Sequence, residues 1–387
     1  MKIAYASTFD AKTLSNPNNW AGTGYYIPES LKKQSISVQY VDSLKEQVTL
    51  QAVCKLKRHY YEFFTGTKYL KALDPLILRS YSNQISQKLA RTEANIVFSA
   101  TIAPIVYLDC HHPIAFWADA TFKDLLNFYP QFTGLCEENI QQGHQMERLA
   151  LQRSSLAIYS SDWAAQTAID YYNADPAKVK VVPFGANVES YETVEEIKEL
   201  IESRPRNKCK LLFLGVDWFR KGGDLALEIA IGLNHLGLDT ELTVVGCEPV
   251  FEGSLPDFIK PLGFISKSTH EGRKEIYRLI ANSHFLILPS IADCTPIVFC
   301  EATSLGVPCL ARRVGGIPTI IKDDLNGKLF DPNSNADEYC EYIFNYFTNF
   351  NQYKNLALSA FHEYESRLNW NISGQKVKEL LMPLHTG

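Results

Sequence analysis

The sequence lacks any apolar run of the ~20 residues that a membrane-spanning helix requires. Its first residues, MKIAYAS, read as a strand and not as the charged and then apolar segments of a secretory leader. Nine cysteines are dispersed over 387 residues, and none forms a C-x-x-C pair. Dispersed thiols of this kind favour reduced cysteines over a disulfide framework. We therefore expect a cytoplasmic protein.

Signals for metal and nucleic-acid binding are also missing. The CHH at residues 110–112 has no second ligand pair at a spacing typical of zinc sites, so we expect no metal. The formal net charge of −5 excludes the strongly basic footprint of a nucleic-acid-binding domain. Hydrophobic residues make up 46% of the chain and charged residues 21%, which is ordinary for a globular protein.

Positive charge is nevertheless concentrated in one region. Between Gln51 and Arg91 the sequence has eight Lys or Arg and two acidic residues, with Tyr and Phe interleaved. One interpretation is a patch over residues 55–91 that makes peripheral contact with anionic lipid at the inner face of a membrane, or with a phosphorylated substrate. The other is a solvated helical face whose aromatic residues pack inward. The second is favoured, because charge runs usually have that role.

Short apolar runs alternate with longer amphipathic stretches along the chain. Helical periodicity is seen, for example, in SDWAAQTAIDYY and GDLALEIAIGLNHLG. Nine short runs read as strands: KIAYA, ANIVFSA, PIAFWA, LAIYSS, VKVVPF, KLLFLG, ELTVVG, HFLILPS and PCLARR. This alternation predicts the α/β class, with parallel sheets covered by helices on both faces.

The length of the chain predicts two domains, because 387 residues exceed what one hydrophobic core usually covers. The alternation pauses over residues 186–208, which are acidic, then basic, and contain proline. We expect an N-terminal domain over residues 1–190 and a C-terminal domain over 191–365, both doubly wound. Residues 366–387 are expected to form a final helix that crosses back to the N-terminal domain.

The stretch PSIADCTPIVFCEATSLGVP, residues 289–308, places Asp293 and Glu301 in an otherwise apolar run. It reads as a strand end, a loop, and a helix that is capped by Thr295, begins at Pro296 and ends at Gly306. In open α/β sheets such loops, at the carboxyl ends of strands, hold ligands. The N–H groups of the first helical turn therefore predict a phosphate site.

The two carboxylates need partners if they are buried. Glu301 leans toward the start of its helix, where the two hydroxyls of a ribose would suit it, and Asp293 could accept hydrogen bonds from other hydroxyls. Alternatively, Asp293 caps the helix or loop and Glu301 pairs with a buried arginine. Both interpretations remain open on the sequence.

The motif D-x(7)-E followed by ATSLGVP resembles the E-x(7)-E motif of family 4 (group 1) retaining glycosyltransferases, which have the GT-B fold. FLGVDWFRKGGDLALEIA, LGFISK and VGGIPTIIKDDLNGKLF are similar to further parts of the family's donor domain, and residues 160–187 to the end of its first domain. The resemblance implies two Rossmann-like domains facing a cleft. It also implies that Glu301 binds the nucleotide ribose and that Asp293 contacts the donor sugar.

The loop GVDWFRKGGD follows the strand KLLFL and carries Arg220 and Lys221. Gly222 and Gly223 let the backbone approach closely, and Asp224 is expected to cap the next helix. Two fixed cations would stabilise a departing diphosphate more in the transition state than in the ground state. A solvated cation pair is the alternative. The family commonly has an arginine where this sequence has Val216, so we expect Arg220 and Lys221 to carry the phosphate charge.

Other candidates lie in both domains. The resemblance places the backbone of Phe264 and Ile265 at the nucleotide base. Gly22 and Gly24 fail the dinucleotide fingerprint, since its third position is Ile27. The resemblance implies that their loop lies near the diphosphate and acceptor, although an ordinary turn is the alternative. It also implies that Asp119, just after a strand, faces the donor sugar, whereas His111 is either a strand-entry residue or an acceptor ligand.

These assignments make up one expected site. Its catalytic residues are Asp293, Glu301, Arg220, Lys221 and Asp119, and the expected acceptor-binding residues are Trp20, His111 and Asp119. The donor-binding set comprises Gly22, Gly24, Arg220, Lys221, Phe264, Ile265, Asp293, Cys294, Thr295, Pro296, Ile297, Val298 and Glu301.

The resemblance implies a hexosyltransferase that moves sugar from a UDP- or GDP-sugar to a hydroxyl of a glycan, lipid-linked or small-molecule acceptor, with retention and by front-face attack. It implies no cofactor beyond the nucleotide sugar as co-substrate. Two other functions remain open: a non-hydrolysing nucleotide-sugar epimerase, and a non-catalytic nucleotide-sugar-binding subunit. The sequence does not assign the sugar, the base or the acceptor.

Overall fold

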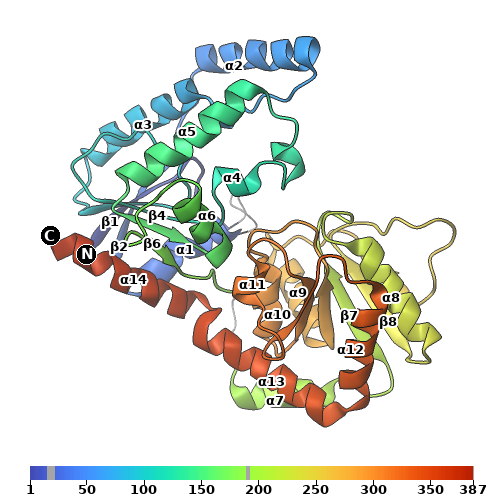
Figure 1. The fold of residues 1–387 in the computed structure, drawn as a ribbon. Helices are drawn as coiled ribbons and strands as arrows, with labels where there is room; N and C mark the ends of the chain where they lie inside the picture. Colours follow the sequence, from blue (N-terminus) through green and yellow to red (C-terminus); the bar gives the residue numbers. More distant parts are fainter. Residues whose placement is uncertain (15–21, 189–191, 387) are drawn as a thin grey trace. The chain divides into compact units, whose positions relative to one another are not determined.

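The computed structural model of the chain describes residues 1–14, 22–188 and 192–386. The chain divides into two compact units, with Met1–Pro183 and Ser373–Gly387 in unit 1 and Phe184–Ile372 in unit 2 (Figure 1). The boundary expected between residues 190 and 191 lies outside the described residues, and the division comes earlier, after Pro183.

Unit 1 contains a parallel six-stranded sheet in the order β2-β1-β3-β4-β5-β6. Its strands are β1 (Lys2–Ala6), β2 (Ser37–Val41), β3 (Ile96–Ser99), β4 (Ile114–Ala118), β5 (Leu156–Tyr159) and β6 (Val179–Val181). Its helices and helical turns are α1 (Thr23–Lys33), α2 (Val48–Tyr60), η2 (Tyr61–Thr65), η3 (Lys71–Leu73), α3 (Pro75–Leu89), α4 (Phe122–Leu125), η4 (Pro130–Phe132), α5 (Glu137–Arg153) and α6 (Asp162–Asp170).

Unit 2 repeats this plan with the strand order β12-β11-β10-β7-β8-β9. Its strands are β7 (Cys209–Leu214), β8 (Thr240–Val245), β9 (Ile259–Pro261), β10 (Phe285–Leu288), β11 (Cys309–Arg312) and β12 (Gly327–Phe330). Its helices are α7 (Val194–Ser203), α8 (Gly223–His235), α9 (His270–Ala281), α10 (Ile297–Thr303), α11 (Ile317–Ile320), α12 (Ala336–Thr348) and α13 (Phe350–Arg367). The fold class predicted from the sequence is confirmed: two doubly wound parallel α/β units.

The central strands explain why the sequence forms such sheets. All four residues of β3, β5 and β10 are buried, as expected for strands covered by helices on both faces. Each of the nine runs interpreted as strands overlaps one in the structure. The three strands that the sequence did not reveal, β2, β9 and β12, all lie at sheet edges.

The last helix, α14 (Trp370–Thr386), begins in unit 2 and continues in unit 1 from Ser373. Within unit 1 it packs closely on α1, because a Cβ atom on Gly374 would lie 2.7 Å from the carbonyl oxygen of Ser30. Val377 and Leu381 on this helix are fully buried.

Two general features bear on the expectations above. All nine cysteines carry free thiols. In the part of the chain that the structure describes, every helix is too short or too polar to cross a bilayer.

Unit 1 buries an acidic side chain, Glu147 on α5, beneath the start of α4. Its carboxylate accepts hydrogen bonds from the N–H of Phe122 (2.9 Å) and the hydroxyl of Tyr159 (3.1 Å). Complete burial outweighs these bonds and raises the pKa of Glu147 to about 7. The folded protein therefore holds a proton here that the unfolded chain releases at a lower pH.

This raised pKa predicts how the stability of unit 1 depends on pH. Glu147 contributes most stability below its unfolded pKa, and the contribution is lost as pH rises through about 7. Glu147→Gln mimics the protonated side chain and should remove this loss, making the variant more stable than wild type by up to about 3 kcal/mol at alkaline pH. Urea unfolding monitored between pH 5 and 9 measures the effect. Equal pH dependence in both proteins would contradict the assignment.

Candidate functional site

The candidate site lies at the carboxyl edge of the unit 2 sheet. The chain builds β7, β8 and β9 outward, and then returns to add β10, β11 and β12 on the other side of β7. The strand order therefore reverses between β7 and β10, and ligands of doubly wound sheets bind at such a switch point. The loops that follow these two strands contain Arg220, Lys221 and Asp293.

The two loops are joined through their backbones. The N–H of Ile291 donates to the carbonyl oxygen of Arg220 at 2.9 Å, and the Arg220 guanidinium donates to the carbonyl oxygen of Ala292 at 2.9 Å. Gly222 makes this contact possible: its φ is +78°, and a Cβ atom there would lie 2.2 Å from the carbonyl oxygen of Pro289. Gly222 therefore allows close approach to a neighbouring loop of the protein itself, whereas Gly223 makes room for the Trp218 ring of its own loop.

Asp293 and the cations predicted for phosphate binding lie together. Asp293 is 5% exposed, and its Oδ2 accepts a hydrogen bond from Lys221 Nζ. Nη1 of Arg220 is 3.9 Å from the same oxygen, and the hydroxyl of Ser290 is 3.4 Å from it. An anion that binds here would therefore interact with the same Lys221 ammonium group as the Asp293 carboxylate. Val216, at the position where the family has arginine, is mostly exposed.

Glu301 has a separate lysine partner. It is 3% exposed on α10, and its Oε2 accepts a hydrogen bond from Lys267 in the loop between β9 and α9. The other oxygen, Oε1, is buried and has no hydrogen-bond partner among the residues that the structure describes. A buried oxygen without a donor is costly, which makes Oε1 a natural acceptor for a ligand hydroxyl.

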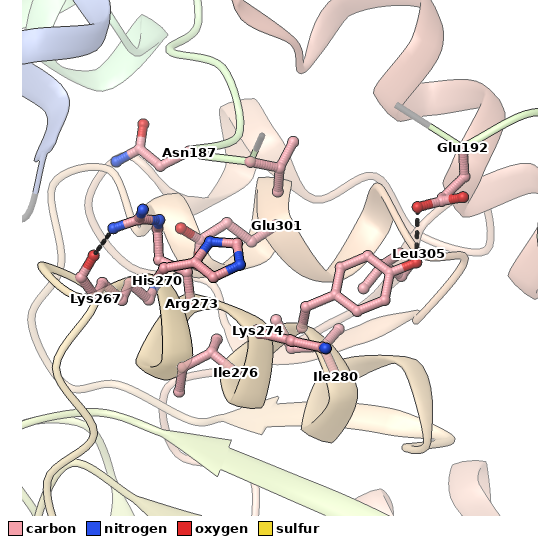
Figure 2. Close-up of a pocket in the computed structure, with 12 residues that line it drawn as sticks. Asn187, Glu192, Lys267, His270, Arg273, Lys274, Ile276, Ile280, Glu301 and Leu305 are labelled. Carbon is pink, nitrogen blue, oxygen red and sulfur yellow. Dashed lines mark hydrogen bonds and ion pairs between the residues drawn. The ribbon is translucent and has the colours of Figure 1, made fainter. Parts of the chain in front are cut away.

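Glu301 faces a pocket of about 480 Å³ within unit 2. In Figure 2, Lys267, His270, Arg273 and Lys274, from α9 and the loop before it, lie on one side of this pocket. Its wall also includes Tyr277, whose hydroxyl donates to Glu192 Oε1 at 2.7 Å (Figure 2). The pocket therefore combines cationic side chains with an acidic acceptor, which suits a ligand carrying both phosphate and hydroxyl groups.

The expected caps of two helices were wrong in detail. α10 has Pro296 as its N-cap and begins at Ile297, so Thr295 is not the cap. α8 has Gly222 as its N-cap, and Asp224 instead accepts a hydrogen bond from Trp218 Nε1 at 2.6 Å. Both predictions assumed an N-cap residue whose side chain accepts a hydrogen bond. In the structure neither N-cap, Pro296 or Gly222, makes a side-chain capping hydrogen bond.

α10 ends at Thr303, with Ser304 as its C-cap, which is earlier than the predicted end at Gly306. Gly306 lies in the turn that follows and has a left-handed φ of 61°. This end is fixed by a buried arginine that the sequence did not single out. Arg204 donates to the carbonyl oxygens of Leu305 and Gly306 at 2.7 and 2.8 Å, and to the Tyr353 hydroxyl at 2.6 Å. Arg204 therefore fixes the helix that carries Glu301.

The remaining predicted donor residues of unit 2 lie in the same region of its sheet. Phe264 is exposed and Ile265 half-buried in the loop between β9 and α9, which also contains Lys267. Cys294 lies in the loop after β10, and the N–H groups of Ile297 and Val298 are in the first turn of α10, where the helix itself offers no acceptor. α10 has only seven residues, so its dipole is short.

In unit 1 the structure brings fewer of the predicted residues together. Asp119 directly follows β4, as predicted, whereas His111 precedes β4 and lies at the opposite edge of the sheet. Gly22 is the N-cap of α1 and Gly24 is buried in its first turn. Trp20 lies outside the described residues. Among the described residues, no group of three or more His, Cys, Asp or Glu is placed to bind a metal.

Lys267 is the functional candidate that the sequence analysis missed. It is 34 positions before Glu301, and the two meet only because the loop after β9 lies near α10. The one available signal was the expectation that a carboxylate in an apolar helix needs a partner. That expectation named an arginine, and the partner is a lysine.

The close contact at Gly222 predicts a measurable difference between two glycines. Gly222→Ala and Gly237→Ala both place a side chain at positive φ, +78° and +83°, but only Gly222 has neighbours within 4 Å. Gly237→Ala should cost ~1 kcal/mol from backbone strain alone, and Gly222→Ala should cost at least ~1 kcal/mol more because the two loops must separate. Thermal unfolding of both variants tests this, and equal losses would contradict it.

Comparisons with known proteins identify similar sequences and similar folds. The sequence of residues 194–361 matches the family described as "Glycosyl transferases group 1". The chain is 27% identical over 188 residues to a D-inositol 3-phosphate glycosyltransferase of Thermobifida fusca, covering 45% of this chain and 43% of the relative. It is 26% identical over 165 residues to an Escherichia coli UDP-Gal:alpha-D-GlcNAc-diphosphoundecaprenol alpha-1,3-galactosyltransferase, covering 41% and 43%. The matches thus span less than half the length of these curated relatives.

The whole chain also resembles solved structures. A sucrose-phosphate synthase from Thermosynechococcus elongatus superposes with a TM-score of 0.69 at 15% identity, covering 100% of this chain and 99% of the other. At such low identity the similarity shows the fold. Residues 194–361 are therefore similar to the glycosyl transferases group 1 family, and the two units of the chain have the GT-B fold.

Proposed function

We propose that this protein is a retaining glycosyltransferase that transfers a hexose from a nucleoside-diphosphate sugar to a hydroxyl group. The family assignment of residues 194–361 supports glycosyl transfer. A uridine nucleotide is the favoured donor, since one relative is named for UDP-Gal, and GDP sugars remain within the proposal. The proposal that configuration at the anomeric carbon is retained rests on the resemblance of the D-x(7)-E motif, Asp293 and Glu301, to that of the family.

One observation carries the proposal: Glu301 Oε1 is buried, lacks a hydrogen-bond donor among the described residues, and belongs to a side chain that lines the pocket. A ribose presents two adjacent hydroxyls, and one of them can donate to Oε1 while Lys267 keeps Oε2. Binding then supplies the missing hydrogen bond. The base would lie against the backbone of Phe264 and Ile265, in the same loop as Lys267.

The cation pair supports a role at the diphosphate. Lys221 and Arg220 converge on Asp293 in the absence of ligand, so both positive groups are already held in place. A bound diphosphate would compete with Asp293 for these cations and free its carboxylate to accept a hydrogen bond from a sugar hydroxyl. The sugar and its leaving group would thus be recognised at adjacent positions.

In the proposed reaction the acceptor hydroxyl attacks the anomeric carbon from the face that the diphosphate leaves. The bond from the anomeric carbon to the diphosphate oxygen breaks, the new glycosidic bond forms, and the acceptor proton passes to the departing phosphate oxygen. Arg220 and Lys221 stabilise the charge that develops on that oxygen. The protein thus supplies position and electrostatics, and no metal or further cofactor is required by this scheme.

The acceptor side is proposed to involve Asp119 and the loop containing Gly22. The two relatives are named for inositol 3-phosphate and for a diphosphoundecaprenol-linked sugar. Both are phosphorylated hydroxyl compounds, and we place the acceptor of this protein in the same broad class, at the cytoplasmic side of a membrane if it is lipid-linked.

The donor and the reaction can be tested in sequence. Thermal-shift measurements against UDP, GDP, ADP and dTDP sugars identify the nucleotide, because a ligand at 100 times its dissociation constant adds about 2.7 kcal/mol of stability. The same donor is then incubated with and without hydroxyl acceptors. Epimerised nucleotide sugar formed without acceptor would favour an epimerase. Tight binding with neither transfer nor donor hydrolysis would favour a non-catalytic subunit.

Loss of either charged contact should lower transfer sharply. Glu301→Ala and Lys221→Ala should each reduce kcat/KM by ~100-fold or more, the scale for losing one well-placed charged contact. Lys354→Ala is the control, because Lys354 pairs with Glu202 at 2.6 Å on the surface of unit 2. Full activity in both site variants would exclude this site, whereas loss in the control would point to a general effect on folding.

A further inference from the structure

The helix α2 and the turn η2 that continues it carry an apolar surface that unit 1 does not cover. Of the 13 residues in α2, only Cys54 is buried. Leu56, Phe63 and Phe64 are 72%, 73% and 69% exposed. In Figure 1, α2 lies at the outer edge of unit 1, beyond α3 and α5 from the sheet. We name the side chains of Leu56, Tyr60, Phe63 and Phe64 the apolar tip.

The apolar tip is a cluster and not a set of isolated side chains. The ring centroids of Phe63 and Phe64 are 5.0 Å apart, and those of Tyr60 and Phe64 are 5.4 Å apart. Single exposed hydrophobic residues are normal on a soluble protein, whereas a contiguous exposed cluster marks a surface that another molecule covers. The fold requires no such cluster, because these rings contribute nothing to the core of unit 1.

The charged residues near the apolar tip indicate what kind of molecule covers it. Several cations of residues 55–91 are already engaged within unit 1: Lys57 with Asp74 and Glu138, Lys71 with Glu46, and Lys88 with the Asp42 carbonyl oxygen. These cations are therefore not available to a broad basic patch over that range. The favoured expectation, that the aromatic residues there pack inward, is wrong for Phe63 and Phe64.

Lys55 and Arg58 are different, because both are exposed and neither forms an ion pair with a described residue. They line a hollow of about 350 Å³ beside α2, together with Gln51 and Tyr69. The lining of the hollow also includes Lys71 and the less polar Cys54, Leu70 and Ala72. Lys55 and Arg58 can each form a charge-assisted hydrogen bond with a phosphate at its border. Cations therefore flank the apolar tip on one helix.

We propose that α2 and η2 dock this protein on an anionic lipid bilayer, with the apolar tip in the boundary between headgroups and acyl chains and with Lys55 and Arg58 at lipid phosphates. Aromatic rings with adjacent cations are the composition of helices that lie in this boundary. Glu62 on η2 offsets part of the positive charge, so burial of the apolar tip supplies most of the binding. The proposal does not rest on the glycosyltransferase reaction.

A second copy of the chain fits this surface less well. A twofold dimer through α2 would place equivalent surfaces against each other, so Lys55 and Arg58 of the two copies would meet like charges. Phospholipid phosphates provide the opposite charge. A bilayer also accepts a protruding helix end, whereas a protein partner would need a matching groove.

Co-sedimentation of the full chain with lipid vesicles tests the proposal. We expect binding to vesicles of phosphatidylcholine mixed with phosphatidylglycerol, and weaker binding to phosphatidylcholine alone. Phe63→Ser with Phe64→Ser should lower the partition coefficient by ~10-fold or more, because two exposed rings lose their apolar contact with lipid. Lys55→Glu with Arg58→Glu should abolish the preference for phosphatidylglycerol. High salt should weaken binding only in part.

The matched control is Val250→Ser with Phe251→Ser, which removes two adjacent exposed hydrophobic residues from unit 2. This control should bind vesicles as wild type does. All substituted positions are at the surface, so melting temperatures should change little. Failure of the wild type to bind mixed vesicles, or equal binding by the Phe63/Phe64 variant, would overturn the proposal. A dimer in solution that the Phe63/Phe64 substitution dissociates would assign the surface to a second copy instead.

Discussion

Two buried carboxylates in unit 2, each held by a lysine from a different loop, are the interaction on which the candidate site depends. Asp293 is bound by Lys221 from the loop after β7, and Glu301 by Lys267 from the loop after β9. A buried carboxylate without such a partner would lose its charge or destabilise the fold. The pairs therefore place each carboxylate at the carboxyl edge of the sheet next to a lysine, and Lys221 is a cation that a diphosphate could share.

The positions of these pairs follow from the topology. Because the strand order reverses between β7 and β10, the loops that follow these strands lie side by side and must be compatible in shape. Gly222 lets the loop after β7 lie close against Pro289. Arg204 fixes the turn after α10 by donating hydrogen bonds to its carbonyl oxygens. Residues outside the two ion pairs thus help to determine where Glu301 and Asp293 are held.

The sequence predicted the parts of the fold and site whose signals are local. Buried central strands such as FLIL are continuous apolar runs, and the loop after that strand showed its carboxylates directly. Three of the four edge strands were missed, and two of them have weak patterns: β9 is only IKP, and β2 alternates without becoming fully buried. Lys267 was missed because its ion pair forms through tertiary structure. The exposed rings of η2 were missed because aromatic residues near a helix are usually assumed to pack inward.

The path of the chain between its units has a consequence for synthesis. Unit 2 is one continuous segment, Phe184–Ile372, whereas unit 1 is completed only by Ser373–Gly387. On the ribosome, unit 2 can close its sheet as soon as its own residues have emerged, while the first 183 residues must wait for the helix that covers α1. Unit 1 is made first and finished last, so a chain that stops early would leave the face of α1 exposed although unit 2 is complete.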